Sequence, residues 1–361
     1  MKKHFLLMFL PLLSVLLLPV AYAEVKVIEA DSAYVMSDND SKIDARRIAM
    51  QEVKRKALEL AGTYIESLTE VKNYELTKDE VRTYTSGIME TEVVTEQMRG
   101  TADHPEIYIK ARCKIDTDVL MKLIEHYRDS EDLKEQLEAS AKESEALRKE
   151  RDDLVRQLAA EKDKGKAEET RKKLDTALAK EETHDDTTRV WTNLAYKLGE
   201  DDKNGHEIQQ AELDNSAIVL ERAITVNPQN QRAHILLAVI YQKKGDYASA
   251  ENELRTVIQH NPSNPIPHMR LGILLRQTGR YEEALREFHF VERLRPHNLM
   301  MLYYTGMTLR DMKRCGRSVQ YLHKFLKDER SNRFPKYQDR ALRSIEVCTE
   351  PGAHQRKISQ D

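Results

Sequence analysis

Residues 238–262 read AVIYQKKGDYASAENELRTVIQHNP, and residues 272–296 read GILLRQTGRYEEALREFHFVERLRP. The two stretches agree in residue type at eight positions, each 34 residues from its counterpart. The matched pairs are Ala238 and Gly272, Tyr241 and Leu275, Gly245 and Gly279, Tyr247 and Tyr281, Ala250 and Ala284, Leu254 and Phe288, Val257 and Val291, and Pro262 and Pro296. Small residues where two helices would approach, a Gly in the turn and a terminal Pro predict a helix–turn–helix unit. Such a unit buries its faces only by stacking on its neighbours.

This spacing resembles the tetratricopeptide repeat family, which implies an α-solenoid. A third unit starts at Leu299, although its turn is degenerate, and an earlier unit contains Trp191 if a polar insertion around 199–205 is allowed. The repeats are therefore expected over 188–350, followed by a tail at 351–361. The expected units are about 188–230 with the insertion, 231–264, 265–298 and 299–332, with a capping helix at 333–350.

The resemblance implies that a partner binds on the concave surface lined by the first helix of each unit. Mapped onto this chain, the residues of that surface and its edge are Ile235, Val239, Lys243, Ile266, Met269, Ile273, Arg276, Met300, Tyr303, Met307 and Arg310. The family's carboxylate clamp needs Lys, Asn and Arg at these positions, which are largely apolar here. We therefore expect an apolar or amphipathic peptide segment, with adaptable Met contacts, rather than a chaperone C-terminus. The alternative is that these side chains simply pack the superhelix.

Composition limits the remaining possibilities. The chain has 361 residues, 58 Lys and Arg against 61 Asp and Glu, and a formal net charge of -3. A mean hydropathy of -0.67 excludes a multi-spanning membrane protein. The expected fold class is multidomain and mainly α, with a small α+β N-terminal domain, a charged helical or coiled-coil spacer and the α-solenoid.

The first 23 residues predict an export signal. Lys2 and Lys3 precede an apolar run that ends in Ala21-Tyr22-Ala23, the small-residue pattern a signal peptidase needs. An uncleaved anchor is the alternative. We expect cleavage, no transmembrane span after it, and a periplasmic protein that is associated with the outer membrane or free of it.

Residues 24–128 are expected to form an α+β module. A capping pattern at Ser41 predicts a helix that ends at Gly62, and the alternation in 63–71 predicts a strand. A short helix from Thr77 and a hairpin formed by 87–98 and 106–115 follow.

This stretch resembles the N-terminal domain of flagellar assembly protein T and related small envelope lipoproteins. The shared features are Ser37-Asp38-Asn39-Asp40, the run Asp44-Ala45-Arg46-Arg47-Ile48-Ala49, and the spacing of Ala57, Ala61 and Gly62. The resemblance implies a non-enzymatic envelope module and assigns no catalytic residue. The chain departs from the lipoproteins because it lacks their acylated Cys.

Residues 129–182 are expected to form a charged helical rod. Leu133, Leu137, Leu147, Leu154 and Leu158 follow the alternating four- and three-residue steps of a coiled-coil seam. Ser140, Ser144, Arg151 and Glu161 occupy other seam positions, and Gly165 interrupts the run. The rod is read as either a solvated spacer or a coil that makes a homodimer.

No motif for catalysis, a metal or a cofactor is present, so a non-enzyme without cofactors is expected. Cys315 and Cys348 are candidates for a disulfide in an oxidising compartment. Against this pairing, equivalent points of stacked repeats lie about a helix diameter apart, beyond the Cα separation of about 7 Å that a disulfide spans.

The charge is unevenly distributed. Residues 24–230 are acidic, whereas residues 231–361 carry a net charge of +9. The sequence therefore predicts an exported protein–protein interaction scaffold whose groove binds a peptide of another envelope protein. It would aid assembly or stability of a flagellar, pilus or outer-membrane complex. The alternative is a cell-wall or surface-polymer binding protein that uses the basic repeat surface. No nucleic-acid partner is expected.

Overall fold

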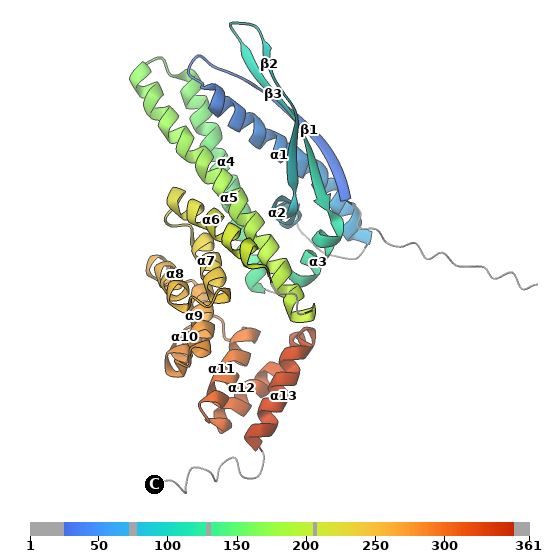
Figure 1. Cartoon of the computed structure of the whole chain (residues 1–361), viewed down its shortest axis with the longest axis vertical. Helices are drawn as coiled ribbons and strands as arrows, with labels where there is room; N and C mark the ends of the chain where they lie inside the picture. The colour runs from blue at the N-terminus through green and yellow to red at the C-terminus, as the bar shows by residue number, and fades with distance from the viewer. Residues whose placement is uncertain (1–24, 72–77, 128–130, 205–207, 350–361) are drawn as a thin grey trace, which may run out of the picture.

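The computed structural model describes residues 25–71, 78–127, 131–204 and 208–349. The predicted signal peptide and the tail lie outside the described residues. A three-stranded sheet with helices, a long helical hairpin and a helical solenoid follow one another along the chain (Figure 1).

The first part is an antiparallel sheet covered by helix α1. Its elements are β1 (Val25–Val35), α1 (Lys42–Val71), α2 (Lys78–Ile88), β2 (Glu90–Gly100), β3 (Pro105–Asp116) and α3 (Thr117–Tyr127). The strand order is β1-β3-β2, so β3 is central. Strand β1 pairs with β3 from Val25 opposite Asp116 to Val35 opposite Glu106. Strand β2 pairs with the other edge of β3 and forms the expected hairpin with it.

The core of this module lies between α1 and the sheet. Every second residue of β3 is buried, in the alternation that one covered sheet face requires. The buried ridge of α1 repeats every four residues and consists of Ala45, Ala49, Val53, Ala57, Ala61 and Ile65. Small side chains on this ridge let the helix approach the strands closely.

Two sequence expectations for α1 are wrong. The helix does not end at Gly62, and residues 63–71 belong to α1 rather than to a strand. The buried ridge continues through Ala61 to Ile65, and this packing outweighs the cost of about 1 kcal/mol for a helical Gly. The start of α1 agrees with the capping pattern, because the backbone N–H of Asp44 donates to Ser41 Oγ at 3.1 Å.

The charged rod is not an extended spacer. It folds back as a hairpin of α4 (Glu131–Ala160) and α5 (Lys164–Asn204), which lies beside α1 (Figure 1). The chain reverses just before Gly165, where the Asp163 carboxylate accepts the backbone N–H of Lys166 at 2.9 Å. Helix α5 continues without interruption through 182–188, the expected border between rod and repeats.

The buried side of α4 packs against other helices of the same chain. Leu137, Ser140, Arg151 and Leu158 on α4 are all buried. Arg151 donates to both oxygens of Glu181 on α5, at 3.0 and 3.2 Å, and to Glu52 on α1 at 2.9 Å. Leu147 and Leu154 of the predicted seam are half-buried, and a homodimer through the rod stays a prediction.

Helix α5 also begins the solenoid. It pairs with α6 (Gln210–Val226), and three regular helix pairs follow. These are α7 (Gln231–Lys243) with α8 (Tyr247–His260), α9 (Pro265–Gln277) with α10 (Tyr281–Leu294), and α11 (Leu299–Asp311) with α12 (Cys315–Lys327). A short 3-10 helix η1 (Glu329–Arg333) and the capping helix α13 (Pro335–Thr349) end it.

The expected insertion around 199–205 is placed differently. Residues as far as Asn204 extend α5, while 205–207 lie outside the described residues.

The repeat is visible in hydrogen bonds as well as in sequence. Asn230, Asn264 and Asn298, 34 residues apart, each accept a backbone N–H in the first turn of α7, α9 and α11. The turn after each of these helices has positive φ at Gly245, Gly279 and Lys313. The turn that is degenerate in sequence therefore keeps the same backbone, with Lys where the other units have Gly.

Candidate functional site

The candidate site is the concave surface formed by the first helices of the repeats. Of the predicted residues, Ile235, Val239, Met269, Tyr303 and Met307 are buried. Ile266, Ile273, Met300, Arg276 and Arg310 are half-buried, and Lys243 is exposed. The packing alternative therefore holds for the five buried residues. The structure leaves the other apolar positions partly open.

The start of this surface is covered by the N-terminal part of the chain. Thr192 of α5, at the position equivalent to Ile235, lies against Gly87 of α2, where an added Cβ would come within 2.0 Å of Thr192 Oγ1. Arg232 of α7 donates to the carbonyl of Gln136 on α4 at 2.7 Å and also bonds Ser140. Helices α2 and α4 thus cover the concave side of α5 and the start of α7.

Arg232, which is half-buried, anchors this contact. Burial lowers its pKa to about 10, while nearby Glu143 acts in the opposite direction. Its guanidinium also lies 5.6 Å from the centre of the Trp191 ring. A cation held at this depth needs fixed acceptors, so the bonds to α4 attach the hairpin firmly to the repeats.

The far end of the surface is covered by the capping helix. Tyr303 packs edge-on against Tyr337 of α13, with ring centroids 4.9 Å apart. Met307 Sδ contacts Ser344 Oγ at 3.3 Å, and Arg310 donates to the same hydroxyl at 3.0 Å. These residues therefore hold the cap in place.

Cys315 and Cys348 form a disulfide that joins α12 to α13, with their Cα atoms 5.1 Å apart. This distance is shorter than the helix diameter that we expect between equivalent points of stacked repeats, so that objection to the pairing is wrong. Cys315 is the first residue of α12 and Cys348 lies near the end of α13, so the two helices bring together residues at opposite ends.

The polar edge of the surface is a ladder between repeats. Gln242 bonds Gln277 at 2.7 Å, and Arg276 bonds Asp311 at 2.6 Å. Both contacts join residues 35 positions apart. Arg276 and Arg310 are thus engaged within the chain, although Arg276 Nε is buried without a hydrogen-bond partner.

The open part of the concave surface lies on α7, α9 and α11. It comprises Lys243, Ile266, Ile273 and Met300, which we call the open groove. Its three apolar side chains pack on the solenoid core and keep one side towards solvent. A surface of this kind can bind an apolar segment flanked by negative charge.

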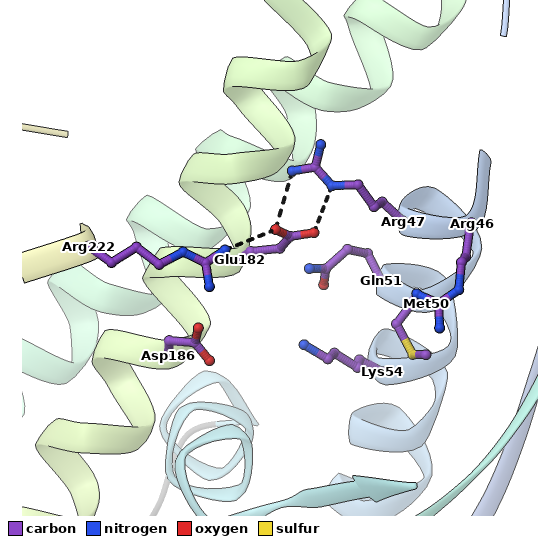
Figure 2. A pocket seen from close by; sticks show the side chains of 8 residues that line it. All are labelled: Arg46, Arg47, Met50, Gln51, Lys54, Glu182, Asp186 and Arg222. Atoms are coloured by element: carbon purple, nitrogen blue, oxygen red, sulfur yellow. Dashed lines mark hydrogen bonds and ion pairs between the residues drawn. The ribbon is translucent and has the colours of Figure 1, made fainter. Parts of the chain in front are cut away.

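A second polar feature joins the three parts of the molecule. A pocket of about 250 Å³ lies between α1, α5 and α6. Figure 2 shows Arg47 of α1 and Arg222 of α6 approaching Glu182 of α5 from opposite sides. Arg47 makes two bonds to Glu182, at 2.8 and 3.2 Å, and Arg222 lies 4.0 Å away.

Other cations of this pocket are also paired, Arg46 with Glu96 at 3.0 Å and Lys54 with Asp185 at 3.4 Å. Paired charges of this kind fix the orientation of helices. We therefore assign the pocket a structural role.

A buried carboxyl group lies deeper in the hairpin. Burial raises the pKa of Glu181 to about 7, against the opposing effect of Arg151; the nearby carboxylates Asp185, Asp152 and Glu52 raise it further. A larger pocket of about 570 Å³ borders this residue and is lined by α1, α2, α4 and α5. Across the described ranges, no cluster of three or more His, Cys, Asp or Glu side chains is arranged to hold a metal ion.

Among the helices that the structure describes, none is long and apolar enough to cross a membrane.

A tetratricopeptide repeat family model matches residues 208–265 and 242–289. The C-terminal half carries tetratricopeptide repeats. The sequence prediction of this repeat is therefore confirmed. Tetratricopeptide repeats form concave surfaces that bind other proteins, so the repeat fold indicates a protein-interaction scaffold.

Several solved structures are similar to this chain. One, a crystal structure of MamA protein, is 15% identical, with 48% of this chain and 85% of that chain covered and a TM-score of 0.34. Pseudomonas aeruginosa PilF is 19% identical over 48% of this chain and 79% of its own, with a TM-score of 0.35. Similarity at this level carries no conclusion about function. No curated protein matches the sequence. The resemblance of residues 24–128 to flagellar assembly protein T stays a prediction.

The contacts that tie the module to the repeats were not identified from the sequence. Asn39 donates to the carbonyls of Leu158 and Glu161 at 2.9 Å, which caps the end of α4. The sequence places Asn39 only in the Ser37-Asp38-Asn39-Asp40 motif of the N-terminal module. Polar residues in an otherwise apolar seam, Ser140 and Arg151, were the available signal, because buried polar side chains require partners.

Proposed function

We propose that this chain is an exported, non-catalytic scaffold whose open groove binds an apolar or amphipathic peptide segment of another envelope protein. In this role it aids assembly or stability of an envelope complex of the flagellar, pilus or outer-membrane type. The observation that carries the proposal is the difference between the two ends of the concave surface and its middle. Helices α2 and α4 fill one end and α13 the other, while Ile266, Ile273 and Met300 keep solvent-facing apolar surface.

The chemistry of the open groove supports this class of partner. Apolar side chains at 266, 273 and 300 provide contact area, and exposed Lys243 lies at the edge. Residues 231–361 carry a net charge of +9, which favours a segment with acidic flanks. Export is expected from residues 1–23.

The test compares two charge insertions in the chain beginning at Glu24. The double variant Ile266→Glu/Ile273→Glu places charge in the open groove, whereas Ile218→Glu on α6, where the side chain is 63% exposed, places charge outside it. The unsubstituted chain should capture a partner protein from envelope extracts in a pull-down. The control variant should still capture this partner, and the double variant should not. Unchanged partners in both would contradict the proposal.

A second measurement avoids any effect on packing. A photo-crosslinking residue at exposed Lys243 should capture the partner in cells, whereas one at Leu294, which is 45% exposed at the end of α10, should not. Equal crosslinking from both positions would argue against the open groove.

A second candidate function rests on α12. This helix contains Arg317, Lys324 and Lys327 but no Asp or Glu, and these three side chains are exposed. The basic stripe suits an anionic cell-wall or surface polymer. Binding of such a polymer should weaken steeply between low and physiological salt, because exposed charges are screened. Salt-independent partner binding would favour the groove instead.

A further inference from the structure

Strand β2 forms an open edge of the sheet. It pairs with β3 on one side, and among the described elements no strand pairs with its other side. Natural proteins protect such an edge with Lys, Pro or a short strand. At the opposite edge of the sheet, Lys56 of α1 donates to the backbone carbonyl of Asp31 on β1 at 2.9 Å. Strand β2 has 11 residues and contains neither Lys nor Pro, so its outward backbone groups are available to another strand.

The core face of β2 is also uncovered. Val93 and Met98 lie opposite Ala111 and Ile107 of β3, which are buried. Helix α1 packs on β1 and β3 and leaves Val93 and Met98 themselves 38% and 51% exposed. A further strand beside β2 would extend the sheet and cover part of both side chains.

The alternation of side chains along β2 identifies a strand that fits beside it. A bulge at Val94 shifts this alternation by one residue. The residues on the core face, each opposite a buried residue of β3, are Thr91, Val93, Glu96 and Met98. This pattern is symmetric about the midpoint between Val94 and Thr95. A second β2 that pairs antiparallel about a two-fold axis at this midpoint therefore places every residue beside one on the same face.

The charges of β2 are complementary in the same register. Within one chain, Glu90 lies opposite Lys114, and Arg99 lies opposite Glu106. The two-fold axis puts Glu90 of one copy beside Arg99 of the other. A row across four strands then alternates in sign, from Lys114 and Glu90 of one copy to Arg99 and Glu106 of the second. Because the axis repeats this row, one kind of contact makes two ion pairs.

Both charged side chains are accessible on the outer face of the sheet. Glu90 is exposed and has no ion-pair partner among the residues that the structure describes. The exposed Arg99 guanidinium lies 3.4 Å from the centre of the Tyr108 ring and donates to Gln97 at 3.1 Å. These contacts hold Arg99 on the face that also carries Glu90.

We propose that two copies of this chain associate edge to edge through β2 and form one continuous six-stranded sheet. Residues 90–99 of the two copies make up to about ten main-chain hydrogen bonds across the axis. The turn between β2 and β3 lies at the end of the molecule opposite α11–α13 (Figure 1). The association surface is therefore separate from the open groove.

The interface consists of one strand from each copy, so the dimer is weak and depends on protein concentration. Stable interfaces bury more than about 1,000 Å² in total.

The test is sedimentation velocity of the chain beginning at Glu24 over a range of concentrations. The wild type should pass from monomer to dimer as concentration rises. Glu90→Arg and Arg99→Glu each place like charges at both contacts and should raise the dimer dissociation constant about tenfold. The control Asp31→Arg reverses an exposed charge on the other edge strand, β1, and should leave the constant unchanged.

Mixing the two single variants gives the sharpest outcome. In the mixed dimer every 90–99 contact joins opposite charges, so association should return to the wild-type level even if each variant alone is less stable. A wild type that stays monomeric at all concentrations would overturn the proposal. A dimer that is insensitive to both reversals, or variants that do not recover on mixing, would overturn it as well, by placing the interface elsewhere, such as on the rod.

Discussion

Replacing Gly272 with Ala should destabilise the solenoid, whereas the same replacement at Gly62 should stabilise the module. In α9, a Cβ on Gly272 would come within 2.4 Å of Phe288 Cε1 and within 2.8 Å of its Cδ1. Phe288 is fully buried, so its ring cannot turn out into solvent to relieve this contact. At Gly62 in α1, a Cβ would meet nothing within 4 Å.

The magnitudes follow from two opposing effects. Overpacking a rigid core costs up to about 3 kcal/mol, while Ala is favoured over Gly in a helix by about 1 kcal/mol. Gly272→Ala should therefore lower the free energy of unfolding by about 2 kcal/mol. Gly62→Ala should raise it by about 0.5 to 1 kcal/mol. Urea unfolding followed by far-UV circular dichroism measures both.

The preceding repeat supplies the rescue. There Ala238 occupies the position of Gly272, and Leu254 that of Phe288. Adding Phe288→Leu to Gly272→Ala reproduces that pair and should recover stability, although Phe288→Leu alone creates a cavity and destabilises. If the double variant loses as much as the two single variants together, the Gly272–Phe288 contact does not limit helix packing.

Three further changes test other features. Lys313 has φ 59°, so Lys313→Gly should stabilise the chain by about 0.5 to 1 kcal/mol in thermal melts, and a loss would contradict the strain. Burial raises the pKa of Glu181 to about 7, above its unfolded value near 4.5. The stability that protonated Glu181 contributes to the folded state is therefore complete below about pH 4.5 and is lost as the pH rises through 7. Melting temperature should therefore fall less between about pH 5 and pH 8 in Glu181→Gln than in wild type, and parallel profiles would refute this assignment. Cys348→Ser should cost about 3 to 4 kcal/mol by the loop-entropy relation and speed hydrogen exchange in α13. Cys315→Ser should match it, and unequal effects would show that the bond is not the cause.

The repeats were predictable because their signal is periodic. Caps at Asn230, Asn264 and Asn298, turns at Gly245 and Gly279, and the small residues Ala238 and Gly272 recur at 34 residues and act locally. The local sequence of each unit is therefore enough to predict its helix–turn–helix structure. The helical start at Ser41 was predictable for the same reason.

The packing of the rod was not predictable from local pattern. The seam of α4 had the correct period, but a period does not say which helix faces it. Here it faces α5 and α1, and the side chains that broke the pattern, Ser140 and Arg151, are those with specific buried partners. Likewise, Gly62 is a local signal for a helix end. The helix continues because Ala61 and Ile65 are buried in the core between α1 and the sheet, a long-range contact that local pattern does not show.

The sequence predicted a set of candidate site residues but not which of them are accessible. Family geometry placed eleven residues on the concave surface or its edge. Only contacts between distant parts of the chain, such as Arg232 with Gln136 and Tyr303 with Tyr337, decide which of them remain open. Such contacts leave no periodic trace in the sequence.

Helix α5 has a mechanical consequence. It is one helix of 41 residues, about 60 Å long, whose first half belongs to the hairpin and whose second half begins the repeats. No flexible joint separates these two roles. A force applied to the repeats is therefore transmitted along one continuous helix to the sheet module. A partner bound to the repeats and a partner bound to the sheet module would accordingly stay at a fixed distance from each other.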